Sequence, residues 1–191
     1  MPSNLSSKIN QSLQIPLSNF DIKKIDPDVK ITTAASDEFL NLDFADELTY
    51  DGKKGILLWP TISATVGHWL GVLINKAKRT LEIFDSYGIT PIEKLSEKLN
   101  GDVQLGKKLA KHLRKIIRNN GYKFIQNKKK IQNLKNSDDQ ACGRYVLMRL
   151  AFYDLSLKQF FKELEKMKLD PKYLAVLGTT TAAATTAATG L

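Results

Sequence analysis

The sequence predicts an α+β fold in which a central mixed or antiparallel β-sheet is flanked by helices. Three observations support this class. Short apolar and β-branched segments follow one another between residues 55 and 88, and amphipathic helical patterns occupy much of the chain beyond residue 91. With 191 residues and 42% apolar side chains, the chain is long enough for one well-buried domain.

The first 15 residues are rich in Ser, Asn and Gln and are expected to form a flexible arm, and PLSNFDIKKIDP then has the start signals of a short helix or turn. Three consecutive strands are predicted in GILLWPTI, HWLGVLIN and TLEIFDSYG. The short basic break NKAKR separates the second strand from the third. It indicates a hairpin turn at the surface.

Helical spacing of apolar residues begins after Pro91 in IEKLSEKL and continues in LGKKLAKHLRKIIRNNG, which ends at a glycine. YKFIQ and KKKIQ are predicted as two short strands. CGRYVLMRLAFYDL is predicted as a buried helix and SLKQFFKELEKMK as a final amphipathic one. Residues 16–176 are expected to form a single domain, and the Thr/Ala-rich residues 177–191 a disordered tail.

The net charge of +9 is concentrated in one part of the chain. Residues 103–137 hold eleven of the 29 Lys and Arg and no acidic residue, whereas residues 31–51 hold six acids and no base. This polarity suits docking to a polyanion, such as a nucleic acid, through one face, although a solvated basic face is at least as good an interpretation. His112, on the same helix, is expected to be solvated. The candidate DNA contacts are Lys107, Lys108, Lys111, Arg114, Lys115, Arg118, Lys128, Lys129 and Lys130.

Cys142 is the only cysteine in the chain. A single cysteine cannot form an internal disulfide or supply a zinc-ribbon set, so no metal is expected. No apolar run approaches the roughly 20 residues of a membrane span, and the N-terminus lacks a secretory signal pattern. The chain is therefore expected inside a cell or a particle, away from membranes. Cys142 is then a structural thiol, an inert surface thiol or a nucleophile.

A cysteine nucleophile needs a base, a group that orients the base, and donors for the oxyanion. Cys142 lies at a predicted helix start, where the helix dipole lowers a thiol pKa, and Gly143 allows a substrate backbone to approach. His68 opens the second predicted strand and Asp85 ends the third. If these strands form an antiparallel hairpin, His68 and Asp85 come out at the same end. On base rates, each residue alone is more often structural than catalytic.

The order His, Asp, Cys in GHW, FDSYG and CGRY resembles the adenain-like and ubiquitin-like-protein-specific cysteine proteases over residues 55–155. More narrowly, it is similar to maturation proteases of virophages, Polinton or Maverick elements and large DNA viruses. The resemblance implies that His68 is the general base and acid, Asp85 its orienting partner and Cys142 the nucleophile, with Trp69 in the site wall. The family's oxyanion glutamine would be Gln132, with Gln140 as the alternative.

The resemblance also implies a function. The substrates would be capsid or core precursors cut during virion maturation at small-residue sites such as Gly-Gly or Gly-Ala. The expected location is the virion or a viral factory in the host cytoplasm, and a monomer is expected. No cofactor would be required, although DNA could serve as an activating scaffold. The alternatives are a protease that removes ubiquitin-like modifiers from host proteins and a non-catalytic DNA-binding virion protein.

Overall fold

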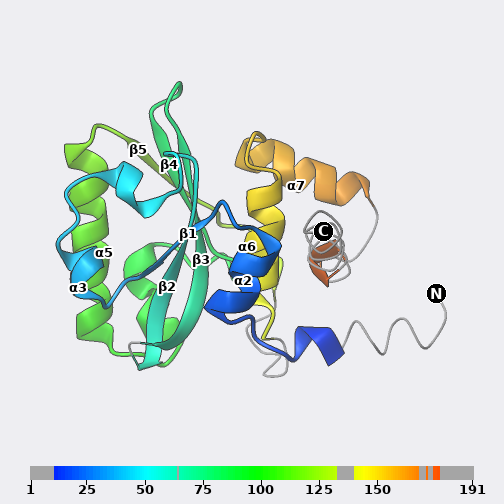
Figure 1. Cartoon of the computed structure of the whole chain (residues 1–191), viewed down its shortest axis with the longest axis horizontal. Coiled ribbons are helices and arrows are strands. Elements are labelled where there is room, and N and C mark those ends of the chain that lie inside the picture. The colour runs from blue at the N-terminus through cyan, green and yellow to red at the C-terminus, as the bar shows by residue number, and fades with distance from the viewer. Residues whose placement is uncertain (1–10, 64, 133–139, 168–170, 172–173, 177–191) are drawn as a thin grey trace, which may run out of the picture.

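The computed structural model describes residues 11–63, 65–132, 140–167, 171 and 174–176. Its centre is a five-stranded sheet in the order β1-β2-β3-β4-β5, with helices on both faces (Figure 1). This arrangement confirms the predicted α+β class. The strands are β1 (Lys30–Thr33), β2 (Lys54–Ser63), β3 (Val66–Asn75), β4 (Thr80–Phe84) and β5 (Lys123–Gln126).

The three strands predicted in sequence order form an antiparallel meander, because β3 pairs with both β2 and β4 in that sense. The predicted turn between β3 and β4 is present, and the Asn75 side chain accepts a hydrogen bond from the Lys78 N–H at 2.9 Å. Parallel strands close both edges of the sheet, with β1 beside β2 and β5 beside β4. The sheet is therefore mixed.

Two strand assignments differ from the sequence prediction. β1 was not predicted, because a segment of four residues is too short to show a clear alternating pattern, although three of the four are β-branched. The strand predicted in KKKIQ is wrong, since residues 128–132 are irregular. The backbone N–H groups of Ile131 and Gln132 both donate to the Ser86 carbonyl oxygen, at 2.9 and 3.0 Å, instead of joining a strand ladder. Residues 131 and 132 are therefore hydrogen-bonded to the turn that comes after β4.

The predicted helices begin close to their expected positions, whereas α3 and η1 were not predicted and α6 ends at Ala151, before the end of the predicted segment. The basic helix starts two residues earlier than its apolar stripe, because the Asp102 side chain accepts hydrogen bonds from the next N–H groups and caps it. IEKLSEKL is a 3₁₀ turn followed by a short helix. The bounds are α2 (Asn19–Ile25), α3 (Asp37–Leu40), η1 (Ala45–Leu48), η2 (Ile92–Lys94), α4 (Leu95–Lys98), α5 (Val103–Asn119), α6 (Cys142–Ala151) and α7 (Leu157–Lys166).

The sheet separates two hydrophobic cores. α5 packs on one face, and α2, α6 and α7 lie on the other (Figure 1). Leu13 and Leu17 are buried in the core beside α6, so part of the predicted N-terminal arm packs against the domain. The tail predicted for 177–191 lies outside the described residues, and the domain limits remain a prediction.

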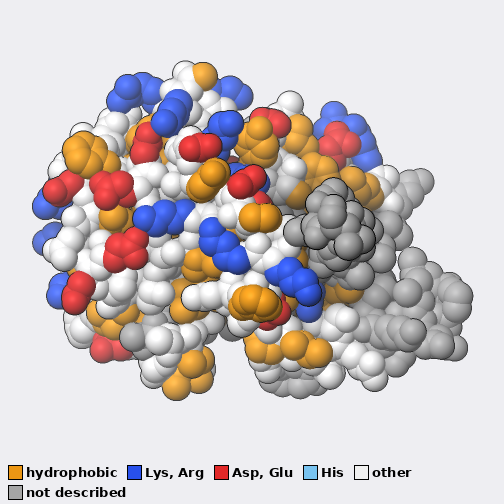
Figure 2. Space-filling view, in the orientation of Figure 1, with side chains coloured by type: hydrophobic (Ala, Val, Ile, Leu, Met, Phe, Trp, Pro, Cys, Tyr) orange, Lys and Arg blue, Asp and Glu red, His pale blue; other side chains and the backbone are white. Residues whose placement is uncertain are grey.

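The face shown in Figure 2 carries basic and acidic side chains intermixed. In the same view, the basic helix α5 lies behind α3, which carries the acidic residues Asp37 and Glu38 (Figure 1). Among the described residues, no helix is both long and apolar enough to cross a membrane.

Candidate active site

His68 and Asp85 lie at the same end of the β3–β4 hairpin, as the sequence predicts. Gly71 pairs with Phe84 in the antiparallel register, so His68 is three residues before that pair and Asp85 is the residue after it. His68 Nε2 is 2.7 Å from Asp85 Oδ1, and both side chains are buried. A buried carboxylate at this distance fixes both the tautomer and the orientation of the imidazole.

The Asp85 carboxylate is held in turn by backbone donors. The Tyr87 N–H donates to Oδ1 at 3.0 Å and the Ile89 N–H to Oδ2 at 2.7 Å. The Tyr87 ring then stacks on the imidazole of His68, with centroids 4.7 Å apart and planes 20° apart. One turn therefore orients the carboxylate and also covers a face of the histidine.

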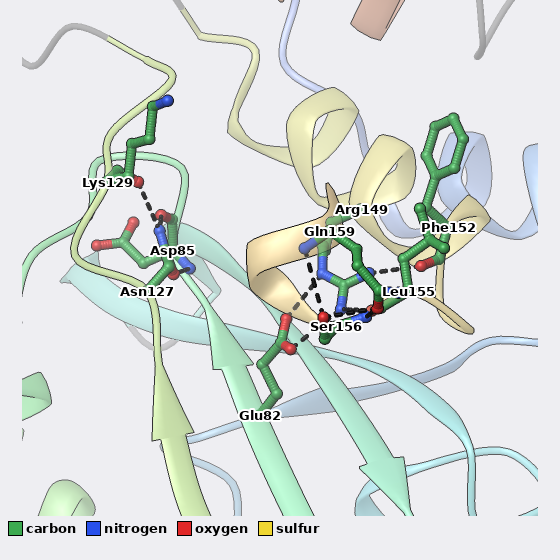
Figure 3. A network of polar contacts seen from close by, with 9 residues as sticks. All are labelled: Glu82, Asp85, Asn127, Lys129, Arg149, Phe152, Leu155, Ser156 and Gln159. Carbon is green, nitrogen blue, oxygen red and sulfur yellow. Dashed lines mark hydrogen bonds and ion pairs between the residues drawn. The ribbon is translucent and has the colours of Figure 1, made fainter. Parts of the chain in front are cut away.

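Asn127 is a site residue that the sequence prediction missed. Its Oδ1 accepts the Asp85 N–H at 2.8 Å, and its Nδ2 donates to the carbonyl oxygens of Asp85 and Lys129 at 2.6 and 2.9 Å (Figure 3). In the sequence, Asn127 stands before a run of three lysines and reads as part of a polar loop. Its position directly after a strand was the only available signal.

Cys142 is the first residue of α6 and is half-buried. Burial alone would raise the pKa of its thiol, but the charge of His68 and hydrogen bonds from His68 and from the Trp69 and Gly143 N–H groups lower it. For His68, burial alone would lower the pKa, yet the Cys142 sulfur and Asp85 raise it to about 10. The two opposite shifts describe a thiolate paired with an imidazolium.

Gln132 and Gln140 have very different surroundings. Gln132 is buried, and the Ser86 hydroxyl donates to its Oε1 at 2.6 Å. Gln140 is exposed, and its backbone N–H donates to the Leu13 carbonyl oxygen at 2.9 Å. The loop NLKNSDD, expected to absorb the extra residues between Gln132 and the cysteine, lies outside the described residues. A buried, oriented amide suits an oxyanion donor better than an exposed one.

Trp69 and Gly143 meet beside the cysteine. A Cβ atom added to Gly143 would lie 3.0 Å from Trp69 Cδ1, so the glycine permits the indole to approach the start of α6. The indole Nε1 donates to the Leu17 carbonyl oxygen at 3.1 Å. Trp69 thus lies beside the start of α6, and its place in the wall of the substrate site stays a prediction.

The predicted DNA contacts do not form one cluster. An open groove of about 1120 Å³ runs beside α5 and β5 on the sheet face opposite α6. None of the three lysines after β5 lines it, and Lys129 instead forms an ion pair with Glu165 of α7. The groove includes all six α5 candidates, namely Lys107, Lys108, Lys111, Arg114, Lys115 and Arg118. The charge of Arg114 is partly neutralised within the chain, since Arg114 forms an ion pair with Glu93.

The expectation that His112 is solvated is wrong. Its ring is half-buried, and Nε2 donates to the Phe39 carbonyl oxygen at 2.9 Å. The ring also packs edge-on against the Phe39 side chain, with centroids 5.2 Å apart. The position of His112 between basic residues on a helix suggested an exposed side chain, but Phe39 of α3 packs against this part of α5. Within the described part of the chain, no group of three or more His, Cys, Asp or Glu side chains could hold a metal ion.

The mixed sheet and the hydrogen-bonded cysteine–histidine pair are those of a cysteine peptidase, a hydrolase that acts on peptide bonds. The chain belongs to the Ulp1 protease family, because residues 53–174 match the C-terminal catalytic domain of that family. This confirms the resemblance seen in the sequence. The chain is also similar to the uncharacterized protein V9 of the Sputnik virophage, with 25% identity over 154 residues, which cover 81% of this chain and 86% of that protein.

Proposed function

We propose that the chain is a viral cysteine endopeptidase with Cys142 as nucleophile, His68 as general base and acid, and Asp85 as the residue that orients His68. The observation that carries this proposal is the position of the His68 ring, which is 2.7 Å from Asp85 Oδ1 and hydrogen-bonded to the Cys142 sulfur. Such a chain of contacts supplies an activated nucleophile and a proton carrier.

In this mechanism the Cys142 thiolate attacks the scissile carbonyl carbon, and the carbonyl oxygen becomes an oxyanion. The Cys142 backbone N–H and the Gln132 side-chain amide stabilise that oxyanion. His68 gives its proton to the leaving amine, which departs and leaves a thioester on Cys142. Water, deprotonated by His68, then attacks the thioester, releases the carboxyl product and restores the pair of Cys142 thiolate and His68 imidazolium.

The substrates that we propose are the capsid or core precursors of a virus, cut during maturation at Gly-Gly or Gly-Ala sites. The similarity to a virophage protein supports a viral source, and the resemblance seen in the sequence supports small residues at the cleavage site. The protease would act in the virion or in a viral factory of the host cytoplasm.

The test is incubation of the purified chain with co-expressed capsid precursors, followed by N-terminal sequencing of the fragments. Cys142→Ala is the matched control and should leave the precursors uncut. A chain that leaves the precursors intact but cleaves a fusion of a ubiquitin-like modifier would support removal of modifiers instead. Cleavage that persists in Cys142→Ala would show that the assigned nucleophile is wrong.

The groove beside α5 supports a second proposal, a sequence-independent contact with DNA. Basic side chains line it along one helix (Lys107, Lys108, Lys111, Lys115 and Arg118), and DNA phosphates are the polyanion such a row would neutralise. Affinity for a short duplex, measured by fluorescence anisotropy, should fall steeply between 50 and 200 mM salt. The affinity for DNA should be lost in a triple variant that carries Glu at Lys107, Lys108 and Lys111. The control is a triple variant with Glu at Lys128, Lys129 and Lys130, which should keep the affinity.

This experiment also tests the non-catalytic alternative. A virion protein that only binds DNA would show the salt-dependent affinity while cleaving no precursor, in the wild type as in Cys142→Ala. If instead the DNA contact activates the protease, adding the duplex should raise the cleavage rate of the wild type and leave the rate of the α5 variant unchanged.

A further inference from the structure

A short segment near the N-terminus, residues 11–18, touches both catalytic segments of the site, although it lies outside the region that matches the family. Its Leu17 carbonyl oxygen accepts the indole N–H of Trp69 at 3.1 Å. Trp69 follows His68 directly and its own backbone N–H donates to the Cys142 sulfur. Leu17 therefore contacts Trp69, which is adjacent to His68 in the chain and hydrogen-bonded to the Cys142 sulfur.

The same segment reaches the other side of the site. The Leu13 carbonyl oxygen accepts the N–H of Gln140 at 2.9 Å, two residues before Cys142. Leu17 Cβ also lies 3.4 Å from the position that a Cβ on Gly143 would occupy. The contacts with residues 140 and 143 thus lie on both sides of the nucleophile.

The apolar side chains of this segment anchor it. Leu13 and Leu17 are only 6% and 7% exposed and pack in one core with Trp69, Ala141 and Tyr145, against which Cys142 also packs. Between them, Ile15 is 61% exposed. The segment is therefore held by two leucines, while its middle residue faces solvent.

No side chain caps the start of α6. Its N-cap residue is Ala141, whose methyl side chain cannot accept a hydrogen bond from the first N–H groups of the helix. α2 and α7, by contrast, each begin with a serine that makes a capping box. The helix that bears the nucleophile is the one without a capping side chain among these three.

We propose that Leu13 and Leu17 are positioning residues that fix the Cys142 segment and the His68–Trp69 segment relative to one another. This inference rests on the proposed roles of Cys142 and His68. A displacement of about 1 Å between a nucleophile and its base can lower the rate by about 100-fold, so two buried leucines remote in sequence can control turnover without touching the substrate.

The test compares Leu17→Ala and the double variant Leu13→Ala/Leu17→Ala with Ile15→Ala as the matched control in the same segment. Two quantities are measured well below each variant's melting temperature. One is kcat and KM on a peptide spanning the mapped cleavage site, and the other is the pH midpoint of Cys142 alkylation by iodoacetamide. We expect kcat to fall about 10- to 100-fold with KM nearly unchanged, and the alkylation midpoint to move to higher pH. Ile15→Ala should match the wild type.

A purely structural role predicts a different result. The alanine variants would melt at lower temperature but keep the wild-type kcat and alkylation midpoint while folded, and that result would overturn the proposal. If the double variant does not fold, the single Leu17→Ala decides by the same two readouts, and Leu17→Met should restore both. A further outcome separates this proposal from the proposed protease function. If the wild type cleaves no peptide but Cys142 of Leu17→Ala is alkylated with a higher pH midpoint than Cys142 of the wild type, the protease function fails and the positioning role stands.

Discussion

The Ser86 hydroxyl donates to Gln132 Oε1 across 2.6 Å, and the Ser86 carbonyl oxygen accepts the backbone N–H of the same glutamine at 3.0 Å. Ser86 follows Asp85, so a single turn after β4 holds both the carboxylate that orients His68 and the amide proposed for the oxyanion. The hydroxyl determines that the oxygen end of the amide faces Ser86.

Ser86→Ala should therefore lower kcat through Gln132. Loss of one oxyanion donor costs about 100- to 1000-fold, so Gln132→Ala should fall in that range and Ser86→Ala should fall less, by about 10-fold. The measurement is a double-mutant cycle on kcat. Ser86→Ala should have no further effect in the Gln132→Ala background, and an additive loss would show that the serine does not act through the glutamine.

Asn127→Ala should destabilise the turn that carries Asp85. The change removes three hydrogen bonds of a buried amide and leaves the Asp85 N–H and carbonyl oxygen without that partner. Each buried group left unsatisfied costs about 1–3 kcal/mol, so the free energy of unfolding, measured in urea, should fall by about 2–5 kcal/mol. Asn119→Ala, at an exposed position, is the control and should change it little.

The buried pair of Arg149 and Glu82 ties α6 to β4, with contacts of 2.8 and 3.0 Å (Figure 3). Removing one partner of such a pair costs about 3–5 kcal/mol, because the other charge stays buried. Arg149→Met should therefore destabilise the chain strongly, and Arg149→Met/Glu82→Leu should recover much of the loss. Glu163→Gln, which breaks the exposed pair with Lys166, should cost at most about 1 kcal/mol.

The reactivity of Cys142 should depend on His68. Because the pKa of the thiol lies below its ordinary value of 9.0, iodoacetamide should alkylate the folded chain quickly at pH values where a free cysteine is mostly protonated. His68→Ala should move the pH midpoint of alkylation upward, toward the ordinary value. A thiol that reacts only after denaturation, in both proteins, would contradict the ion pair.

The stability of the fold should follow the His68 proton in a defined window. The imidazole keeps its proton in the folded chain up to about pH 10, against an ordinary value of 6.5 in the unfolded chain. Its contribution is complete below pH 6.5 and is lost as the pH rises toward 10. Cys142 acts oppositely, since its lowered pKa adds stability above pH 9.0 that is lost as the pH falls through the folded value. Because the two contributions offset each other between pH 6.5 and 9.0, urea unfolding of wild type and His68→Ala should show a nearly constant difference over that range, and the difference should shrink between pH 9 and 10.

Local patterns were sufficient for much of the fold and for the candidate triad. The meander strands and α5 follow from apolar spacing, which depends only on neighbours in the chain. The approach of His68 and Asp85 follows from a short hairpin between adjacent strands. In each case the contacts join residues that are close in sequence, so a single short segment is sufficient to predict the structure.

The remaining features depend on contacts between distant parts of the chain. Asn127 binds Asp85 across 42 residues and Ser86 binds Gln132 across 46, while Trp69 binds Leu17 across 52. No spacing rule relates such positions. The irregular course of KKKIQ and the half-burial of His112 have the same origin, because a competing partner brought near by the fold outweighs local propensity. By itself the sequence determined which residue types could do the chemistry, and the tertiary structure decided which side chains hold them in place, since a hydrogen bond forms only between groups that the whole fold has brought together.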